Sequence, residues 1–281
     1  MEYKQIMKEQ IEQLHNDGYL VLKDVFNKDT MMQWRHHLIN YFSDRNNCCK
    51  VENYQKTKPD AINYKEFDLH LDFFRSEKLI SVLREACGGE LKYAHHYDTH
   101  IDIAPGKMHH DGGIRHLAWK WNEGQIKTYL KEKYDLTIQE LCRTNTWKDY
   151  NKVFEDTNNK YLVKGEELLV YRVGTYLQDH SKSGGLAVLK GSHKKPHKQC
   201  KEIYAPCSIG DVVIWDCRVF HAATGKGNNR CFVHTALGKP NFLLDLYIEA
   251  TQARVTKQNS KSKYVLREEL KQVLDSMKVL Y

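Results

Sequence analysis

Five pairs of histidine and aspartate, each pair separated by one residue, carry side chains that can bind a metal. They are His15/Asp17, His70/Asp72, His96/Asp98, His100/Asp102 and His109/Asp111. Residues two apart on an extended chain point to the same side of it, so an imidazole and a carboxylate at this spacing can reach one ion. A chain of this composition, with 15 histidines, would contain about one such pair by chance. The pattern alone is therefore weak evidence for a metal site.

The first two pairs have simpler explanations. Asp17 precedes Gly18 at the end of an expected helix, where an aspartate is typical of a turn. His70 lies between aromatic residues, and a histidine at the surface or at the edge of the core accounts for it. Both pairs are interpreted as structural.

The other three pairs lie close together in the chain. If residues 93–103 are extended, His96, Asp98, His100 and Asp102 face one way, and this polar face either lines a pocket or meets water. His109/Asp111 differs because it follows a Pro-Gly turn and precedes two glycines, which leave room for a ligand to approach.

A third ligand for such a metal has to come from far downstream. In the segment 210–238, a predicted strand ends near Asp216, His221 follows on a turn, and Arg230 begins the next strand. Two histidines and one carboxylate on one face are the ligands of non-haem Fe(II) oxygenases. Arginine is the side chain best suited to bind a carboxylate through two hydrogen bonds. Taken singly, His221 is a loop histidine and Arg230 a salt-bridge partner, but their order and spacing together favour a site.

The elements that must position these residues are helices first and strands later. Helical spacing or capping signals predict helices over residues 2–16, about 29–42 (with an N-cap at Asp29-Thr30) and 76–88. Short apolar runs between turns predict strands at 19–26, 91–107, 167–178, 185–189, 211–216 and 231–238. This order favours a β-barrel or jelly roll with flanking helices. We expect one domain over 1–281, with a mostly helical insertion at about 120–165 and a C-terminal helix at 264–280.

Composition excludes some classes of protein. The net charge of +7 comes from scattered lysines, and no nucleic-acid-binding motif accompanies them, so nucleic-acid binding is disfavoured. The N-terminal segment is charged and lacks the apolar core of a signal peptide, and no apolar run reaches the ~20 residues of a membrane span. A cytosolic protein that does not bind membranes is expected, in which the eight cysteines are free thiols.

Four ordered motifs resemble the phytanoyl-CoA dioxygenase-like family of Fe(II)/2-oxoglutarate oxygenases. The sequence "HNDGYLVLKDVF" (15–26) is similar to the family's N-terminal strand, and "IAPGKMHHDGG" (103–113) to its turn and His-x-Asp ligands. "SGGLAVLKGSHK" (183–194) is similar to its segment joining two barrel strands, and "GDVVIWDCRVFH" (210–221) to the strand ending at the distal histidine. The resemblance covers most of the chain and is weakest across 43–75, 120–165 and beyond 240.

This resemblance implies a mainly β protein with a double-stranded β-helix core and selects one of the five pairs. It implies that His109, Asp111 and His221 bind Fe(II), and that Arg230 pairs with 2-oxoglutarate. O2 would drive decarboxylation of 2-oxoglutarate to succinate and CO2, coupled to oxidation of an unactivated C–H bond. Ala223 stands where some relatives carry a serine that helps bind 2-oxoglutarate, so Thr224 or Thr175 is expected to replace it.

The product and substrate are less closely defined. The carboxylate of Asp111 occupies the position that halogenases leave open, which favours hydroxylation, with desaturation or ring closure as alternatives. Arg115, His116, Trp119 and Tyr97 are candidates for the substrate site, although Trp119 could instead pack in the core and Arg115 pair with an acid. The basic surplus favours a small anionic substrate, such as a carboxylate or amino-acid derivative. Two other classes stay open, a catalytically inactive barrel that binds or regulates and a basic nucleic-acid-binding protein.

Overall fold

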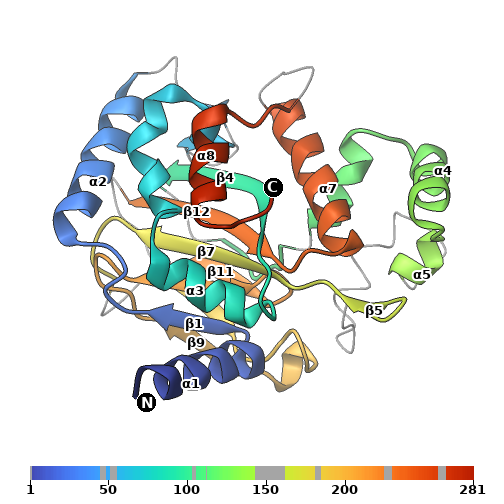
Figure 1. The fold of residues 1–281 in the computed structure, drawn as a ribbon, viewed down its shortest axis with the longest axis horizontal. Helices are drawn as coiled ribbons and strands as arrows, with labels where there is room; N and C mark the ends of the chain where they lie inside the picture. The colour runs from blue at the N-terminus through green and yellow to red at the C-terminus, as the bar shows by residue number, and fades with distance from the viewer. Residues whose placement is uncertain are drawn as a thin grey trace.

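In the computed structural model, the protein consists mainly of two antiparallel β-sheets and the helices around them (Figure 1). The structure describes residues 2–44, 49–50, 56–102, 106–111, 113–142, 162–180, 185–224, 230–258 and 264–281. In both sheets the spatial order of the strands differs from their order in the chain, so strands far apart in the sequence are neighbours. This interleaving is what allows a ligand near residue 110 to meet one near residue 221.

The larger sheet has seven strands in the order β1-β10-β7-β12-β4-β3-β2. Their bounds are β1 (Tyr19–Leu22), β10 (Val212–Asp216), β7 (Val170–Tyr176), β12 (Cys231–Gly238), β4 (Lys92–Ile101), β3 (Lys56–Lys58) and β2 (Cys49–Lys50). The smaller sheet contains β11 (His221–Thr224), β8 (Gly185–Leu189) and β9 (Glu202–Ala205), and a separate ribbon pairs β5 (Leu162–Val163) with β6 (Glu166–Glu167).

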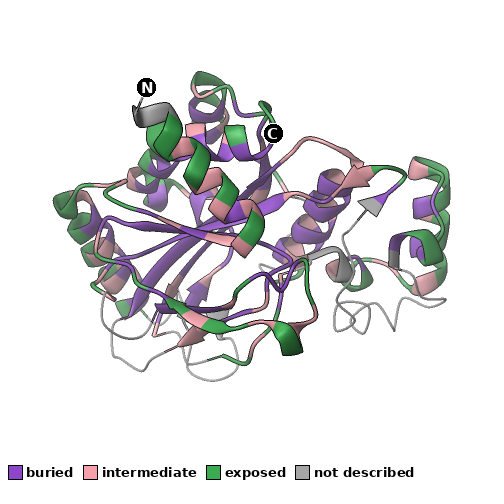
Figure 2. Ribbon diagram, turned by 90° about the horizontal axis from the view of Figure 1, so that it is seen from below, coloured by how far each residue is buried: buried purple, intermediate pink, exposed green. Residues whose placement is uncertain are grey.

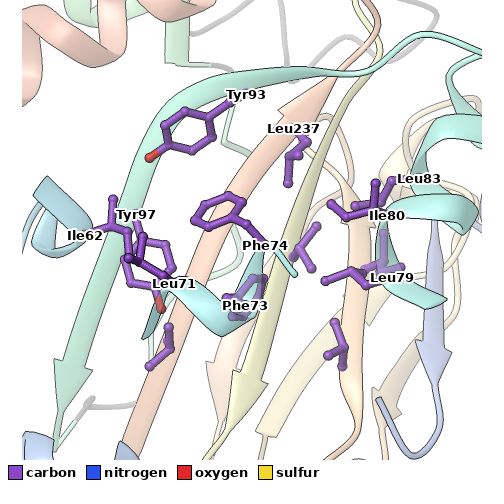
Figure 3. Packing of buried hydrophobic residues seen from close by; sticks show 14 of the residues in the cluster. Ile62, Leu71, Phe73, Phe74, Leu79, Ile80, Leu83, Tyr93, Tyr97 and Leu237 are labelled. Atoms are coloured by element: carbon purple, nitrogen blue, oxygen red, sulfur yellow. The ribbon is translucent and has the colours of Figure 1, made fainter. Parts of the chain in front are cut away.

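Alternation along the strands divides the core into two layers. On the outer face of the large sheet, Tyr93 and Tyr97 of β4 pack against Phe73, Phe74 and other apolar side chains from the helical segments (Figure 3). On the inner face, Tyr176, Trp215 and Phe232 pack against apolar residues of β8 and β9. The central strands β7, β10 and β12 are therefore buried on both sides, and Figure 2 shows the middle of the sheet as buried.

Helices cover the outer face of the large sheet and extend the molecule at one end (Figure 1). The α-helices are α1 (Glu2–Asp17), α2 (Lys28–Ser43), α3 (Glu77–Ala86), α4 (Glu123–Tyr134), α5 (Ile138–Cys142), α7 (Phe242–Gln258) and α8 (Glu268–Ser276). The 3₁₀ segments are η2 (Ala61–Asn63), η3 (Lys65–Phe73), η4 (Gly113–Trp119) and η6 (His197–Gln199). None of these described helices is long and apolar enough to cross a membrane.

Most predicted elements are present, with boundaries that local hydrogen bonds explain. The cap of α2 is Asn27, two residues before the predicted one, and its side chain accepts a hydrogen bond from the Thr30 amide. The predicted strand 19–26 ends at Leu22, because Asp24 adopts a left-handed conformation with φ of 50°. Helices α4 and α5 lie in the first part of the expected helical insertion at about 120–165, and residues 143–161 of it lie outside the described residues.

Helix α7 is the longest of the elements that sequence patterning missed. It is buried over much of its circumference, from Leu243 to Val255, and so lacks the single apolar stripe by which a surface helix is recognised. Leu243, Leu246 and Tyr247 belong to the same apolar cluster as Leu117 of η4 and Ile126 of α4. This packing holds η4, which directly follows the second His-x-Asp ligand, against the barrel.

Candidate metal centre and its two cavities

Backbone pairing brings the predicted metal ligands together. The His109 amide donates to the His221 carbonyl oxygen at 2.9 Å, and the His221 amide donates back at 2.8 Å. The Asp111 amide donates to the Cys217 carbonyl oxygen at 2.8 Å. The segment after the Pro-Gly turn is thus fastened to the start of β11, so both histidines and the aspartate face the same space.

The side-chain geometry suits one metal ion. His221 Nε2 lies 3.3 Å from Asp111 Oδ2, and His109 Nε2 lies 3.9 Å from Asp111 Oδ1. One ligand atom from each of the three residues lies within 4.8 Å of the others. Each imidazole has its Nδ1 at 2.9 Å from a backbone carbonyl oxygen, of Lys107 for His109 and of Val219 for His221. Donation from Nδ1–H to these carbonyls leaves both Nε2 lone pairs for a metal.

Arg172 keeps the third ligand charged. Its Nε donates to Asp111 Oδ2 at 2.8 Å, and its side chain is almost completely buried. Burial by itself would raise the pKa of the Asp111 carboxyl, but Arg172 and His221 outweigh it and hold that pKa well below its usual range. The aspartate is therefore an anion, the form that a metal requires.

The inner face of the large sheet forms the floor beneath these ligands. Arg172, Gly174 and Tyr176 alternate along β7, and His234 of β12 lies beside both Gly174 and Asp98 of β4. A Cβ at Gly174 would lie 2.3 Å from Cζ of Phe232, so any larger residue here would force the Phe232 ring to move. The glycine therefore makes room for this ring, which lines the cavity above the sheet.

A cavity of about 270 Å³ extends from the predicted metal ligands to Tyr176. Its apolar walls include Leu186, Trp215 and Phe232. At its edge, Arg230 Nη2 donates to the Gly185 carbonyl oxygen at 3.0 Å and lies 3.4 Å from the Tyr176 hydroxyl, and the guanidinium carbon is 5.2 Å from the centre of the Tyr176 ring. A buried arginine beside a phenol is a suitable receptor for a carboxylate.

The two threonines expected to help bind 2-oxoglutarate lie in different places. Thr224 Oγ1 donates to the Gly185 carbonyl oxygen at 3.2 Å, the same oxygen that Arg230 contacts, so Thr224 lies beside Arg230. Thr175 alternates with Tyr176 and faces the opposite side of β7, where its hydroxyl donates to the Asp211 carbonyl oxygen at 2.9 Å. Tyr176, which sequence reasoning missed, is the residue of this pair that lines the cavity.

A second cavity, of about 260 Å³, meets the first at the metal ligands. Both are lined by His109, Asp111, Arg172 and Arg254. The remaining lining residues of the second cavity are His96, His116, Trp119, Tyr247, Thr251 and Gln258. They come from β4, η4 and α7, so the missed helix supplies one wall.

The predicted substrate residues divide between this cavity and the core. His116 and Trp119 line the second cavity, with ring centres 4.9 Å apart, and Trp119 is 41 % exposed, which rules out the alternative that it packs in the core. Tyr97 lies elsewhere: it is fully buried on the outer face of β4, 3.1 Å from His70 Nδ1. The side chain of Arg115 lies outside the described part of the chain.

A second His–Asp–His cluster lies next to the metal centre. His96, Asp98 and His234 also bring ligand atoms within 4.8 Å of one another, and all three are buried. Here Arg254 binds both oxygens of Asp98, at 2.9 and 3.1 Å. Burial lowers the pKa of His96 to about 3 and that of His234 well below its usual range, with Arg172 as the second cause for both.

Comparison with known proteins agrees with the motifs. The family model described as phytanoyl-CoA dioxygenase matches residues 151–230, the segment that includes β7, β8, β10 and β11 and ends at Arg230. A search of curated proteins finds no match. The match to the family model confirms the resemblance identified from the sequence.

Solved structures share the fold at low sequence identity. The non-haem α-ketoglutarate-dependent epimerase SnoN from nogalamycin biosynthesis aligns with a TM-score of 0.55 and 10 % identity over 84 % of each chain. The carbocyclase SnoK from the same pathway gives 0.54 and 13 % over 83 % of each. EctD from S. alaskensis with bound Fe gives 0.53 and 13 %, over 82 % of this chain and 76 % of that one. The predicted jelly-roll fold is thereby confirmed.

Proposed function

From the match to the phytanoyl-CoA dioxygenase family and from the site itself, we propose that this protein is an Fe(II)- and 2-oxoglutarate-dependent oxygenase. It would oxidise an unactivated C–H bond of a small molecule. The observation that carries this proposal is that two Nε2-presenting histidines and an ionised aspartate line a cavity together with Tyr176, whose hydroxyl contacts Arg230. A metal and a dicarboxylate together fit this arrangement.

Each residue at the site has a definite task in this proposal. His109, Asp111 and His221 hold the iron, and Arg172 keeps Asp111 ionised and fixed in orientation. Arg230 and Tyr176 bind the distal carboxylate of 2-oxoglutarate, while Leu186, Trp215 and Phe232 exclude water along its length. Iron bound there supplies the chemistry that couples decarboxylation of 2-oxoglutarate by O2, to succinate and CO2, with oxidation of the substrate. Hydroxylation is favoured, and desaturation or ring closure are alternative outcomes of the same oxidation.

The second cavity is the proposed substrate chamber. At about 260 Å³ it lies below the ~300–1,000 Å³ of typical sites for drug-sized ligands, so we propose a metabolite-sized substrate. Its polar lining, with Arg172 and Arg254, supports a carboxylate or amino-acid derivative. His116 and Trp119 form its outer part, where they would contact the end of the substrate away from the iron. A cytosolic location and a helical insertion at about 120–165 stay predictions.

An anaerobic titration tests the proposed activity. Adding Fe(II) and then 2-oxoglutarate to the metal-free protein should produce a weak visible charge-transfer band, and O2 should then yield succinate. The variant His109→Ala should lose both signals, whereas His110→Ala should keep them, because His110 packs against Phe220 and lines neither cavity. Absence of the band would leave an inactive binding barrel, and tight oligonucleotide binding without it would favour the nucleic-acid alternative.

A further inference from the structure

The terminal nitrogens of the Arg172 guanidinium are not used in the contact with Asp111. Its Nε is committed to Asp111, but its buried Nη1 has no hydrogen-bond partner among the described residues. Leaving a buried charged donor unpaired is costly, and such groups are paired in most proteins. Because Arg172 lines both cavities, a ligand in either one can supply the missing acceptor.

The other arginine of the chamber is already occupied. Arg254 contacts both oxygens of Asp98 and also His96 Nδ1 at 3.1 Å, so its terminal nitrogens are engaged in a buried pair. His96 of the same wall adds no positive charge, since burial lowers its pKa to about 3. Among the arginines that line the described chamber, Arg172 is therefore the one with a buried nitrogen that has no hydrogen-bond partner.

A nearby histidine has the same unmet requirement. His234 Nδ1 is buried without a hydrogen-bond partner, while its Nε2 lies 2.8 Å from His100 Nε2. His100 Nδ1 in turn lies 2.8 Å from the Thr57 hydroxyl. If the hydroxyl donates to His100, then His100 donates to His234, and His234 presents an N–H in the same region as Arg172. Two unused donors on one inner face call for an anionic acceptor.

We infer that Arg172 is the anchor for the carboxylate of the primary substrate, holding Asp111 through Nε and the substrate through its terminal nitrogens. The inference rests on the proposed function and deepens it by assigning the substrate class to one residue. Arginine suits both tasks because its planar guanidinium offers donors in a fixed fork, which lysine cannot reproduce. A substrate anchored there lies directly beside the ligand Asp111, which brings its nearest carbon atoms close to the metal centre.

Matched acids and amides test this inference. The wild-type protein with Fe(II) and 2-oxoglutarate would be screened for succinate release against L-amino acids, 2-hydroxy acids and the primary amide of each. At least one acid should stimulate release, and its amide should need at least about tenfold higher concentration, as expected for loss of one charge-assisted hydrogen bond. In Arg172→Lys and Arg172→Gln this preference should disappear.

A second readout separates the substrate from 2-oxoglutarate, whose own carboxylates could also reach Arg172. The 2-oxoglutarate concentration that half-saturates the anaerobic charge-transfer band should stay within about threefold of wild type in Arg172→Lys, well under the tenfold expected if a charge-assisted bond were lost. The control Lys257→Gln removes a positive charge over the exposed Trp119 ring and should keep the acid preference. The inference is overturned if no acid outperforms its amide, if Arg172→Lys keeps the preference, or if that variant instead weakens 2-oxoglutarate binding. If the wild-type protein shows no charge-transfer band, the proposed function itself is overturned.

Discussion

The two His–Asp–His clusters each contain two histidines and one aspartate with ligand atoms within 4.8 Å of one another, yet their surroundings give them different chemistry. In the cluster of His109, Asp111 and His221, backbone carbonyls hold both Nδ1 atoms and the Nε2 atoms face a cavity. In the cluster of His96, Asp98 and His234, Arg254 occupies both carboxylate oxygens. A cation at that position repels a metal, so only the first cluster has ligand atoms available.

The difference lies in the arginine beside each aspartate. Arg172 contacts Asp111 through Nε alone, at Oδ2, and leaves Oδ1 uncommitted. Arg254 binds Asp98 through both terminal nitrogens, and the Asp60 amide donates to Oδ1 as well. Arg172 therefore leaves one oxygen of Asp111 available to a metal, whereas Arg254 pairs with both oxygens of Asp98 in a buried ion pair. Ligand identity and spacing alone do not identify a metal site.

The largest expected effect comes from breaking the buried cluster. Asp98→Ala leaves the Arg254 guanidinium buried without its anion, which should destabilise the protein by about 3–5 kcal/mol and lower Tm by roughly 6–20 °C in thermal unfolding. The matched control Asp72→Ala breaks an ion pair whose two side chains are both half-exposed, and should cost under about 1 kcal/mol. Equal Tm values for the two variants would show that the Asp98–Arg254 pair contributes no more than a surface pair.

A smaller effect should come from Arg230, which lies beside Tyr176 in the wall of the cavity at the first cluster. Arg230→Met removes this charged donor, and should raise the 2-oxoglutarate concentration needed for half-maximal succinate release about 10- to 100-fold. Arg84→Met makes the same change at a guanidinium that donates to the Met277 carbonyl oxygen, far from the site in the chain, and should leave this requirement unchanged. Identical requirements in both variants would remove Arg230 from the co-substrate site.

The smallest expected effect is the contribution of His96 to the pH dependence of the free energy of unfolding. The pKa of His96 is about 3 in the folded protein and about 6.5 in an unfolded chain, so the unfolded state binds more protons between these values. Stability should therefore fall as pH drops below about 6.5, by about 1 kcal/mol per pH unit for this group. Urea unfolding at pH 7.5, 6.0 and 5.0 should show a shallower decline for His96→Asn than for wild type. The control His36→Asn, on the exposed face of α2, should follow wild type, and parallel curves for all three proteins would contradict the assignment.

The sequence was sufficient to predict the residues that can be recognised from their order in the chain and from the turns and strands beside them. His109, Asp111, His221 and Arg230 follow recognisable turns and strands, and the structure brings the first three together at a cavity whose wall includes Tyr176, the neighbour of Arg230. Alternation along 93–103 also predicted the polar face that carries His96, Asp98 and His100, and these residues do line the cavities. That segment has a local irregularity, since His95 has a left-handed φ of 51°.

Residues that act through long-range packing could not be predicted in this way. Arg172 and Tyr176 lie within a strand that is buried along its whole length, where no alternation of polar and apolar residues shows which side faces the site. This ambiguity also explains why Thr175 was selected instead of Tyr176. Arg254 lies on α7, whose apolar residues give no single stripe, so neither the helix nor its contact with Asp98 could be recognised.

The central claim is that the metal binds to one of the two clusters and not the other. Fe(II) binding can be titrated anaerobically with 2-oxoglutarate present, in wild type and in the matched variants His221→Asn and His234→Asn, following the charge-transfer band and the iron content of the isolated protein. The account predicts one iron per chain in wild type and in His234→Asn, and neither iron nor band in His221→Asn. Iron and band that survive in His221→Asn but vanish in His234→Asn would contradict it.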